Sequence, residues 1–281
     1  MEAYTSFKTH NDEQPAYSLG LTLSGGGAKG FAHLGVLKAM EEKGLRPGII
    51  SGTSAGALAG VLYADGNSPD QILTFFENKA FKEFAELTIP HTGIFKADRF
   101  KHFLKKHLKA ETFEELRIPM KIVATDIVEG TSVVFDKGPL VPAVLASCAY
   151  PIVFTPMEID NVHYVDGGLF MNFPVRVIRP QCEVVIGVNA SPLTKQKFKN
   201  SLLYIAERSF HYITASNSVI DRNLCDILIE SNKLSKFAMF TMEDCGEIFE
   251  IGYKLGIKEF EKEKNAYKID SIKSIQEKAL L

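Results

Sequence analysis

The chain alternates short apolar runs with longer segments in which apolar residues recur at helical spacing. Buried strands are predicted for the runs at 19–23, 48–50, 120–126, 183–188 and 226–230, with a hairpin partner at 132–135. Helices are predicted for 31–40, which reads as amphipathic, and for 57–64, 69–84, 97–108, 201–212 and 248–262, with a loop at 90–93. Strands separated by helices favour an α/β fold with a mainly parallel central sheet and helices on both faces.

A single domain is expected over 17–262, because no repeat or low-complexity linker divides the chain. The segment 1–16 is polar and 263–281 is rich in Lys and Glu, so we expect a mobile N-terminal segment and a charged C-terminal tail outside the domain. With 281 residues, of which 46% are hydrophobic, the chain can bury one large core.

Charge and composition exclude several classes of protein. The net charge of −2 gives no attraction to nucleic acid. The segment 1–16 has no apolar signal-peptide core, and no apolar run is long enough to span a membrane. The four cysteines are scattered, which predicts free thiols and a cytoplasmic location. No cluster of His and Cys has zinc spacing, so we expect neither a metal nor a cofactor. Composition leaves the oligomeric state open.

The pentapeptide Gly52-Thr53-Ser54-Ala55-Gly56 has the G-x-S-x-G pattern and lies between a predicted strand and a predicted helix. This is the setting of a nucleophile elbow, in which a strained turn exposes the central serine at a helix N-terminus. The flanking Gly52 and Gly56 leave room for the turn. A serine that merely caps the helix is the alternative for the pentapeptide taken alone.

A second glycine-rich loop, Gly25-Gly26-Gly27-Ala28-Lys29-Gly30, joins the first predicted strand to the first predicted helix. Its backbone N–H groups could form an oxyanion hole beside a serine nucleophile. The same letters satisfy G-x-G-x-x-G, which is also a dinucleotide-binding pattern. That pattern needs an acidic residue at the end of the next strand, where this chain has the serine pentapeptide instead.

A third motif, Asp166-Gly167-Gly168, follows the short β-type run 162–165. Asp166 is a candidate proton acceptor for Ser54, because a serine that attacks an ester needs a base. A carboxylate has a low pKa in water and would have to be desolvated to act as that base. Taken alone, Asp-Gly-Gly is most often a turn.

Together these motifs resemble the patatin-like phospholipase family, in the order that the family has them. The segments 146–156 and 172–174 also resemble family blocks, and the resemblance spans 17–192 well. It implies a three-layer sandwich with Ser54 as nucleophile, Asp166 as base and the amides of Gly25, Gly26 and Gly27 as oxyanion hole. It also implies a fatty acyl ester substrate, either a phospholipid or a lysophospholipid. Lys29 stands where many members have arginine, which leaves its role near the oxyanion hole open.

A Ser-His-Asp triad is the nearest alternative. Its histidine should follow the acid, and only His211 does so, within a predicted helix rather than a loop. His163 precedes Asp166 and reads as a surface or packing residue. Acyl transfer to an acceptor other than water, and lipid binding without catalysis, are further alternatives to hydrolysis.

The region between the elbow and the strand 120–126 is rich in phenylalanine, and its second helix is strongly basic. The rings predict core packing together with an apolar trough or cover for an acyl chain. Lys101, Lys105 and Lys106 form either a solvated face or a peripheral contact with anionic lipid headgroups.

Overall fold

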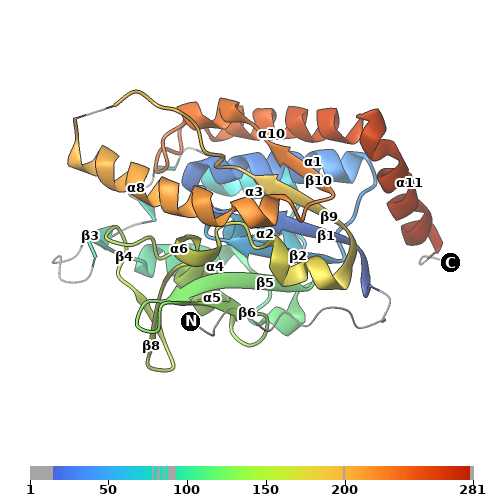
Figure 1. The fold of residues 1–281 in the computed structure, drawn as a ribbon. Helices are drawn as coiled ribbons and strands as arrows, with labels where there is room; N and C mark the ends of the chain where they lie inside the picture. Colours follow the sequence, from blue (N-terminus) through green and yellow to red (C-terminus); the bar gives the residue numbers. More distant parts are fainter. Residues whose placement is uncertain are drawn as a thin grey trace.

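A computed structural model describes residues 15–77, 79–80, 83–84, 86–87, 93–198 and 200–278 of the chain. Its centre is an eight-stranded sheet in the order β10-β9-β1-β2-β5-β8-β7, with β6 also paired to β5 (Figure 1). The strands are β1 (Tyr17–Leu23), β2 (Ile49–Thr53), β5 (Met120–Asp126), β6 (Thr131–Phe135), β7 (Met157–Ile159), β8 (Val162–Asp166), β9 (Cys182–Asn189) and β10 (Ile227–Glu230). Strands β3 (Glu86–Leu87) and β4 (Phe95–Lys96) form a separate antiparallel pair.

The five strands from β10 to β5 run parallel, whereas β6, β8 and β7 are antiparallel to their neighbours. The register places Leu23 of β1 beside Gly52 of β2, and Thr53 of β2 beside Val123 of β5. The carboxyl ends of β1 and β2 therefore meet at one edge of the sheet, where both glycine-containing motifs begin.

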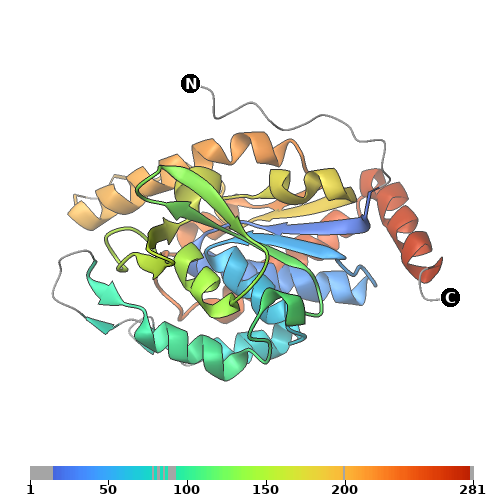
Figure 2. The ribbon, with the colours of Figure 1, turned by 90° about the horizontal axis from the view of Figure 1, so that it is seen from below.

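Helices cover both faces of the sheet (Figure 2). One layer holds α1 (Phe31–Glu42), α2 (Ala55–Ala64), α3 (Pro69–Phe76), α4 (Asp98–His107), α5 (Leu140–Ser147) and α10 (Cys245–Phe260). The other holds α6 (Gly168–Met171), α7 (Val175–Ile178), α8 (Leu202–Asn217) and α9 (Val219–Arg222). Neighbouring residues of β2 show the division, because Ile50 belongs to the main core and Ile49 to a smaller core with Phe173 and Val185. The predicted α/β architecture is confirmed.

Three predicted elements differ from the structure. Helix α1 is not amphipathic, because it packs against α10 and α3 as well as α2 and is buried on nearly all sides. The helix predicted over 69–84 begins with a capping box formed by Ser68 and Gln71 but already ends at Phe76. The pattern of phenylalanines continues past this end because Phe84, outside the helix, packs on Phe76 and Phe103.

The third difference is at the C-terminus. Residues expected in a charged tail form helix α11 (Glu263–Lys278), and its Ile269 and Ile272 are buried in the main core. The loop predicted at 90–93, apart from Gly93, and the segment 1–14 lie outside the described residues. Within the part of the chain that the structure describes, none of the helices is long and apolar enough to cross a membrane.

Candidate active site

Ser54 lies in the turn between β2 and α2, in a backbone conformation that residues other than glycine rarely adopt. Its φ is 52° and its ψ −121°, so the turn is strained. Gly56 makes the turn possible, because a Cβ there would lie 2.2 Å from the carbonyl oxygen of Leu23. The strand, sharp turn and helix predicted for an elbow are therefore present. Ser54 stands at the N-terminus of α2, where the helix dipole favours negative charge.

Ser147, the last residue of α5, holds the turn from behind. The Ser54 N–H donates to Ser147 Oγ at 2.8 Å, and the Ser147 hydroxyl donates to the carbonyl of Val123 at 2.6 Å. Ser147 is fully buried. Sequence reasoning noted the segment 146–156 but gave Ser147 no role, because a hydrogen bond to a backbone N–H leaves no pattern in the letters.

Asp166 ends β8 and faces the nucleophile. Its carboxylate accepts a hydrogen bond of 2.8 Å from the Gly168 N–H. Asp166 is 1% exposed, and this burial raises the pKa of its carboxyl from 3.8 to about 6, against the opposing effects of the nearby Ser54 hydroxyl and the Gly168 N–H. The carboxylate is therefore a stronger base than aspartate in water, as a direct proton acceptor for serine requires.

The glycine-rich loop follows β1 and passes beside Ser54. The Gly25 N–H donates to the Asn172 carbonyl at 2.9 Å, and the Ala28 N–H donates to the Met239 carbonyl at 2.7 Å. The expectation that Gly25 is an oxyanion donor is therefore wrong, since its N–H is already used. The N–H groups of Gly26 and Gly27 make no hydrogen bond to any residue that the structure describes.

Gly27 has a left-handed φ of 59°, and a Cβ there would lie 2.4 Å from the Met239 carbonyl oxygen. Only glycine fits both conditions. The remaining motif glycines are also tightly packed: a Cβ would approach a neighbouring atom to 2.9 Å or closer at Gly30, Gly52, Gly167 and Gly168. These residues bring the two loops and β8 into close contact around Ser54.

Lys29 points away from this arrangement. Its side chain is buried, it interacts electrostatically with Glu207 and Arg208 of α8, and it is absent from the residues that line the cavity at Ser54. Burial lowers the pKa of its ammonium group, and the Glu207 carboxylate opposes this effect. The expected place of Lys29 in the oxyanion hole is therefore wrong; the side chain joins the loop to α8 instead.

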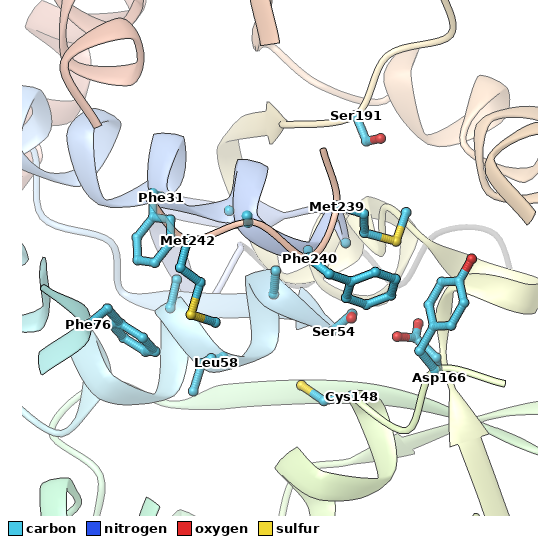
Figure 3. A pocket seen from close by; sticks show the side chains of 18 of the residues that line it. Phe31, Ser54, Leu58, Phe76, Cys148, Asp166, Ser191, Met239, Phe240 and Met242 are labelled. Atoms are coloured by element: carbon cyan, nitrogen blue, oxygen red, sulfur yellow. The ribbon is translucent and has the colours of Figure 1, made fainter. Parts of the chain in front are cut away.

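Ser54 and Asp166 open into a cavity of about 140 Å³ whose walls are mainly apolar (Figure 3). Leu58, Phe76 and Phe100 line the cavity together with Met239 and Phe240. Tyr150 also lines the cavity, and its ring packs on Phe210 and Phe240. Its hydroxyl is buried and has no hydrogen-bond partner among the described residues. The cavity thus combines an apolar wall with polar groups that could meet an ester, among them Ser54, Asp166 and Tyr150.

Cys148 is a fourth group beside the nucleophile that sequence reasoning did not assign. Its thiol lies within hydrogen-bonding reach of the Ser54 hydroxyl, and burial together with the Asp166 carboxylate raises the pKa of the thiol well above its usual value. The thiol therefore stays protonated and acts as a polar wall beside Ser54 rather than as a second nucleophile.

The histidines lie elsewhere. His211 is buried in α8 with both ring nitrogens in hydrogen bonds, to the Ser191 carbonyl at 3.2 Å and to Arg208 at 2.9 Å. His163 is half exposed on β8, 3.9 Å from Glu158. Within the described ranges, neither histidine is hydrogen-bonded to Ser54 or Asp166, and no group of His, Cys, Asp and Glu could hold a metal ion.

Several curated proteins are similar to this chain. An uncharacterized NTE family protein of Mycobacterium tuberculosis is 29% identical over 237 residues, which cover 79% of this chain and 65% of that protein. Patatin-like phospholipase domain-containing protein 6 of Homo sapiens is 31% identical over 170 residues, or 58% of this chain and 12% of that protein. The chain thus spans less than two thirds of the length of either.

Among solved structures, VipD from Legionella pneumophila superposes with a TM-score of 0.58 at 14% identity, covering 87% of this chain and 67% of VipD. That likeness concerns the fold alone. The family model for patatin-like phospholipase matches residues 21–178, a segment that contains the glycine-rich loop, the elbow and Asp166. The chain therefore belongs to the patatin-like phospholipase family.

Proposed function

We propose that the protein is a serine lipid acyl hydrolase that cleaves fatty acyl esters, phospholipid or lysophospholipid, through a Ser54-Asp166 dyad. The observation that carries this proposal is that Ser54 and the buried Asp166 line the same apolar cavity, where the Ser54 hydroxyl is near enough to lower the pKa of the Asp166 carboxyl. Asp166 lies beside a nucleophile held at a helix N-terminus, and its raised pKa suits proton transfer near neutral pH. A protein that only bound lipid would not need this base.

In the first half of the reaction, Ser54 Oγ attacks the ester carbonyl carbon while its proton passes to Asp166. The negative charge that forms on the carbonyl oxygen is stabilised by the N–H groups of Gly26 and Gly27, which have no other partner among the described residues. When the tetrahedral intermediate collapses, the C–O bond to the alcohol breaks. Asp166 returns the proton to the leaving alkoxide, and the acyl group stays on Ser54.

In the second half, a water molecule takes the place of the alcohol. Asp166 removes its proton as the water oxygen attacks the acyl carbonyl, and the same two N–H groups hold the oxyanion. Collapse releases the fatty acid and returns the proton from Asp166 to Ser54 Oγ. An acceptor alcohol in place of water would make the enzyme an acyltransferase, by the same steps.

The cavity sets the substrate class. Its apolar wall suits an acyl chain, and the unpartnered Tyr150 hydroxyl is available to donate to an ester or headgroup oxygen. At about 140 Å³ the cavity is smaller than the roughly 300–1,000 Å³ of typical ligand pockets, so a long chain needs the segment with Met239 and Phe240 to shift. We further propose a cytoplasmic protein that meets its lipid by peripheral attachment to a membrane.

The proposal is tested by incubating the protein with a total lipid extract and comparing wild type, Ser54→Ala and Ser274→Ala by mass spectrometry. Ser274 is exposed on α11, outside the lining of the cavity, and serves as the control. Free fatty acid should appear with wild type and Ser274→Ala only, and a fluorophosphonate should label Ser54. New acylated lipids without free fatty acid would indicate acyl transfer. Lipid binding without labelling of Ser54 would show that the protein is not an enzyme of this type.

A further inference from the structure

Helix α8 exposes a face that carries no charged residue. Its exposed positions recur at helical spacing, and they are Leu202, Ile205, Ala206, Ser209, Tyr212, Ile213 and Ser216. Leu202 is 85% exposed and Ile213 45%. The charged residues of the helix, Glu207 and Arg208, are only partly exposed, and the Arg208 guanidinium lies over the Tyr212 ring, 4.5 Å from its centre, at the margin of the face. A helix on the surface of a soluble protein normally turns charged residues outward, so this face, called here the α8 face, suggests a partner.

The segment before the helix extends the same surface. Leu193 is exposed, and so is Phe198, at 73%. Lys195 and Lys197 alternate with them, are also exposed and form no ion pair with any residue in the described ranges. Apolar side chains next to unpaired lysines are the composition with which proteins lie on membranes, because the rings and aliphatic groups enter the interface and the lysines meet anionic headgroups.

The inner side of α8 lines the candidate active site. Phe210 and Thr214 lie in the cavity wall, and the Phe210 ring packs on Tyr150 with the ring centres 4.3 Å apart. Asn217 at the end of the helix donates to the carbonyl of Gly168, the last residue of the Asp166 motif. Figure 1 shows α8 on the outside of its layer, next to α6. A lipid surface against the outer face would therefore be one helix away from Ser54.

We propose that the α8 face, together with residues 193–198, is the surface with which the protein lies on an anionic lipid bilayer. The proposal rests on the proposed function, because it assigns that activity its contact with the substrate phase. It also replaces α4 as the membrane contact. Phe100, Phe103 and Leu104 of α4 are buried, so that helix offers a bilayer only the charge of its lysines.

The test is co-sedimentation with vesicles of phosphatidylcholine alone and of phosphatidylcholine mixed with phosphatidylserine. The variant combines Leu202→Ser, Ile205→Ser and Ile213→Ser, which are exposed and leave the core unchanged. Loss of these three side chains should weaken binding to the mixed vesicles more than about tenfold. Lys195→Ala with Lys197→Ala should remove the preference for phosphatidylserine. The matched control, Lys101→Ala, Lys105→Ala and Lys106→Ala on α4, should bind nearly as wild type.

Two further measurements separate the possible failures. Hydrolysis of a soluble short-chain ester should be unchanged in the α8 variant. If wild type hydrolyses no ester but binds vesicles more tightly than the α8 variant does, the proposed function alone is refuted. Equal vesicle binding by wild type and the α8 variant would overturn the membrane surface. The same holds if gel filtration shows a wild-type dimer that the variant converts to a monomer without any change in vesicle binding, since the face would then cover a second copy.

Discussion

Ser147 Oγ holds the backbone of the nucleophile: it accepts a hydrogen bond from the N–H of Ser54 at 2.8 Å, and its hydroxyl donates one to the Val123 carbonyl at 2.6 Å. Replacement by alanine should leave the partly buried N–H of Ser54 without this partner and remove one hydrogen bond to the Val123 carbonyl. We expect Ser147→Ala to lower the free energy of unfolding by about 1–3 kcal/mol and to lower kcat because the elbow relaxes. Ser216→Ala removes an exposed serine from α8 and is the control. Urea unfolding of both variants measures the two free energies of unfolding. Equal values would show that the two hydrogen bonds of Ser147 do not stabilise the fold.

The second prediction concerns pH and activity. Because burial raises the pKa of Asp166 to about 6, the base is protonated in acid, and kcat/KM for a soluble ester should fall about tenfold per pH unit below about pH 6. Burial lowers the pKa of His211, and His211→Gln should show the same fall as wild type if Asp166 is its source. A rate profile that is flat down to pH 4.5 would contradict the role of Asp166 as base.

The third prediction concerns Asp166 and stability. Its folded-state pKa lies above the unfolded value of 3.8, so the folded protein holds this proton more tightly, and the ionisation of Asp166 lowers stability as pH rises from about 4 through 6. The loss amounts to roughly 3 kcal/mol above pH 6. Asp166→Asn should therefore be inactive yet more stable than wild type at pH 8, with a smaller gain at pH 4. Thermal unfolding at both pH values measures this.

The same variant separates dyad from triad. His163→Gln and His211→Gln should retain most turnover, since neither histidine is hydrogen-bonded to Ser54 or Asp166 within the described residues. In a triad, one of them would be as inactive as Asp166→Asn. Circular dichroism shows whether each variant is folded. The value of kcat/KM for one soluble ester is then compared among Asp166→Asn, His163→Gln and His211→Gln. A folded, inactive histidine variant would refute the dyad.

The fourth prediction compares two glycines with the same backbone. Gly27 and Gly44 both have left-handed φ angles, 59° and 71°, but a Cβ at Gly44 would meet no atom within 4 Å. Gly44→Ala should lose about 1–2 kcal/mol of stability and keep its activity. Gly27→Ala should lose more stability, because of the Met239 carbonyl, and should lose kcat because an oxyanion donor moves. Full activity in Gly27→Ala would remove this N–H from the mechanism.

The fifth prediction uses Tyr150→Phe. Since the hydroxyl has no partner among the described residues, its removal should leave the free energy of unfolding unchanged or higher. If the hydroxyl donates to a substrate oxygen, kcat/KM should fall by about tenfold or more. Burial raises the pKa of this phenol far above neutral, so it is a proton donor at any working pH. Unchanged kinetics would show that the substrate does not reach it.

Local motifs were readable from the chain because each one is defined by backbone needs within a few residues. The elbow at Ser54 requires glycine beside it, and the alternation of apolar runs predicted the sheet. The helix predicted over 69–84 is too long because Phe84 packs in the same aromatic cluster as Phe76 but does not lie in the same helix. Periodicity records which side chains are buried together, not where the backbone turns.

The features of the site and the fold that could not be predicted from the sequence depend on contacts with residues far away in the chain. Gly25 looks equivalent to Gly26 and Gly27, yet its N–H is used by the carbonyl of Asn172, which is far away in the chain. Lys29 looks like a site residue and turns towards Glu207 instead. Helix α11 has so few apolar residues that Ile269 and Ile272 do not form a recognisable amphipathic pattern in the sequence, although both are buried in the core.

Helix α8 has one further consequence, which follows from its thickness. A helix with its side chains is about 10–12 Å across, whereas the hydrocarbon of one leaflet is about 15 Å deep, half of a bilayer core of roughly 30 Å. With the outer face of α8 on a bilayer, a lipid could reach Ser54 with one chain while its other chain stayed in the leaflet. Such a lipid would never cross water as a free monomer, so turnover would follow the density of lipid in the surface rather than its concentration in solution.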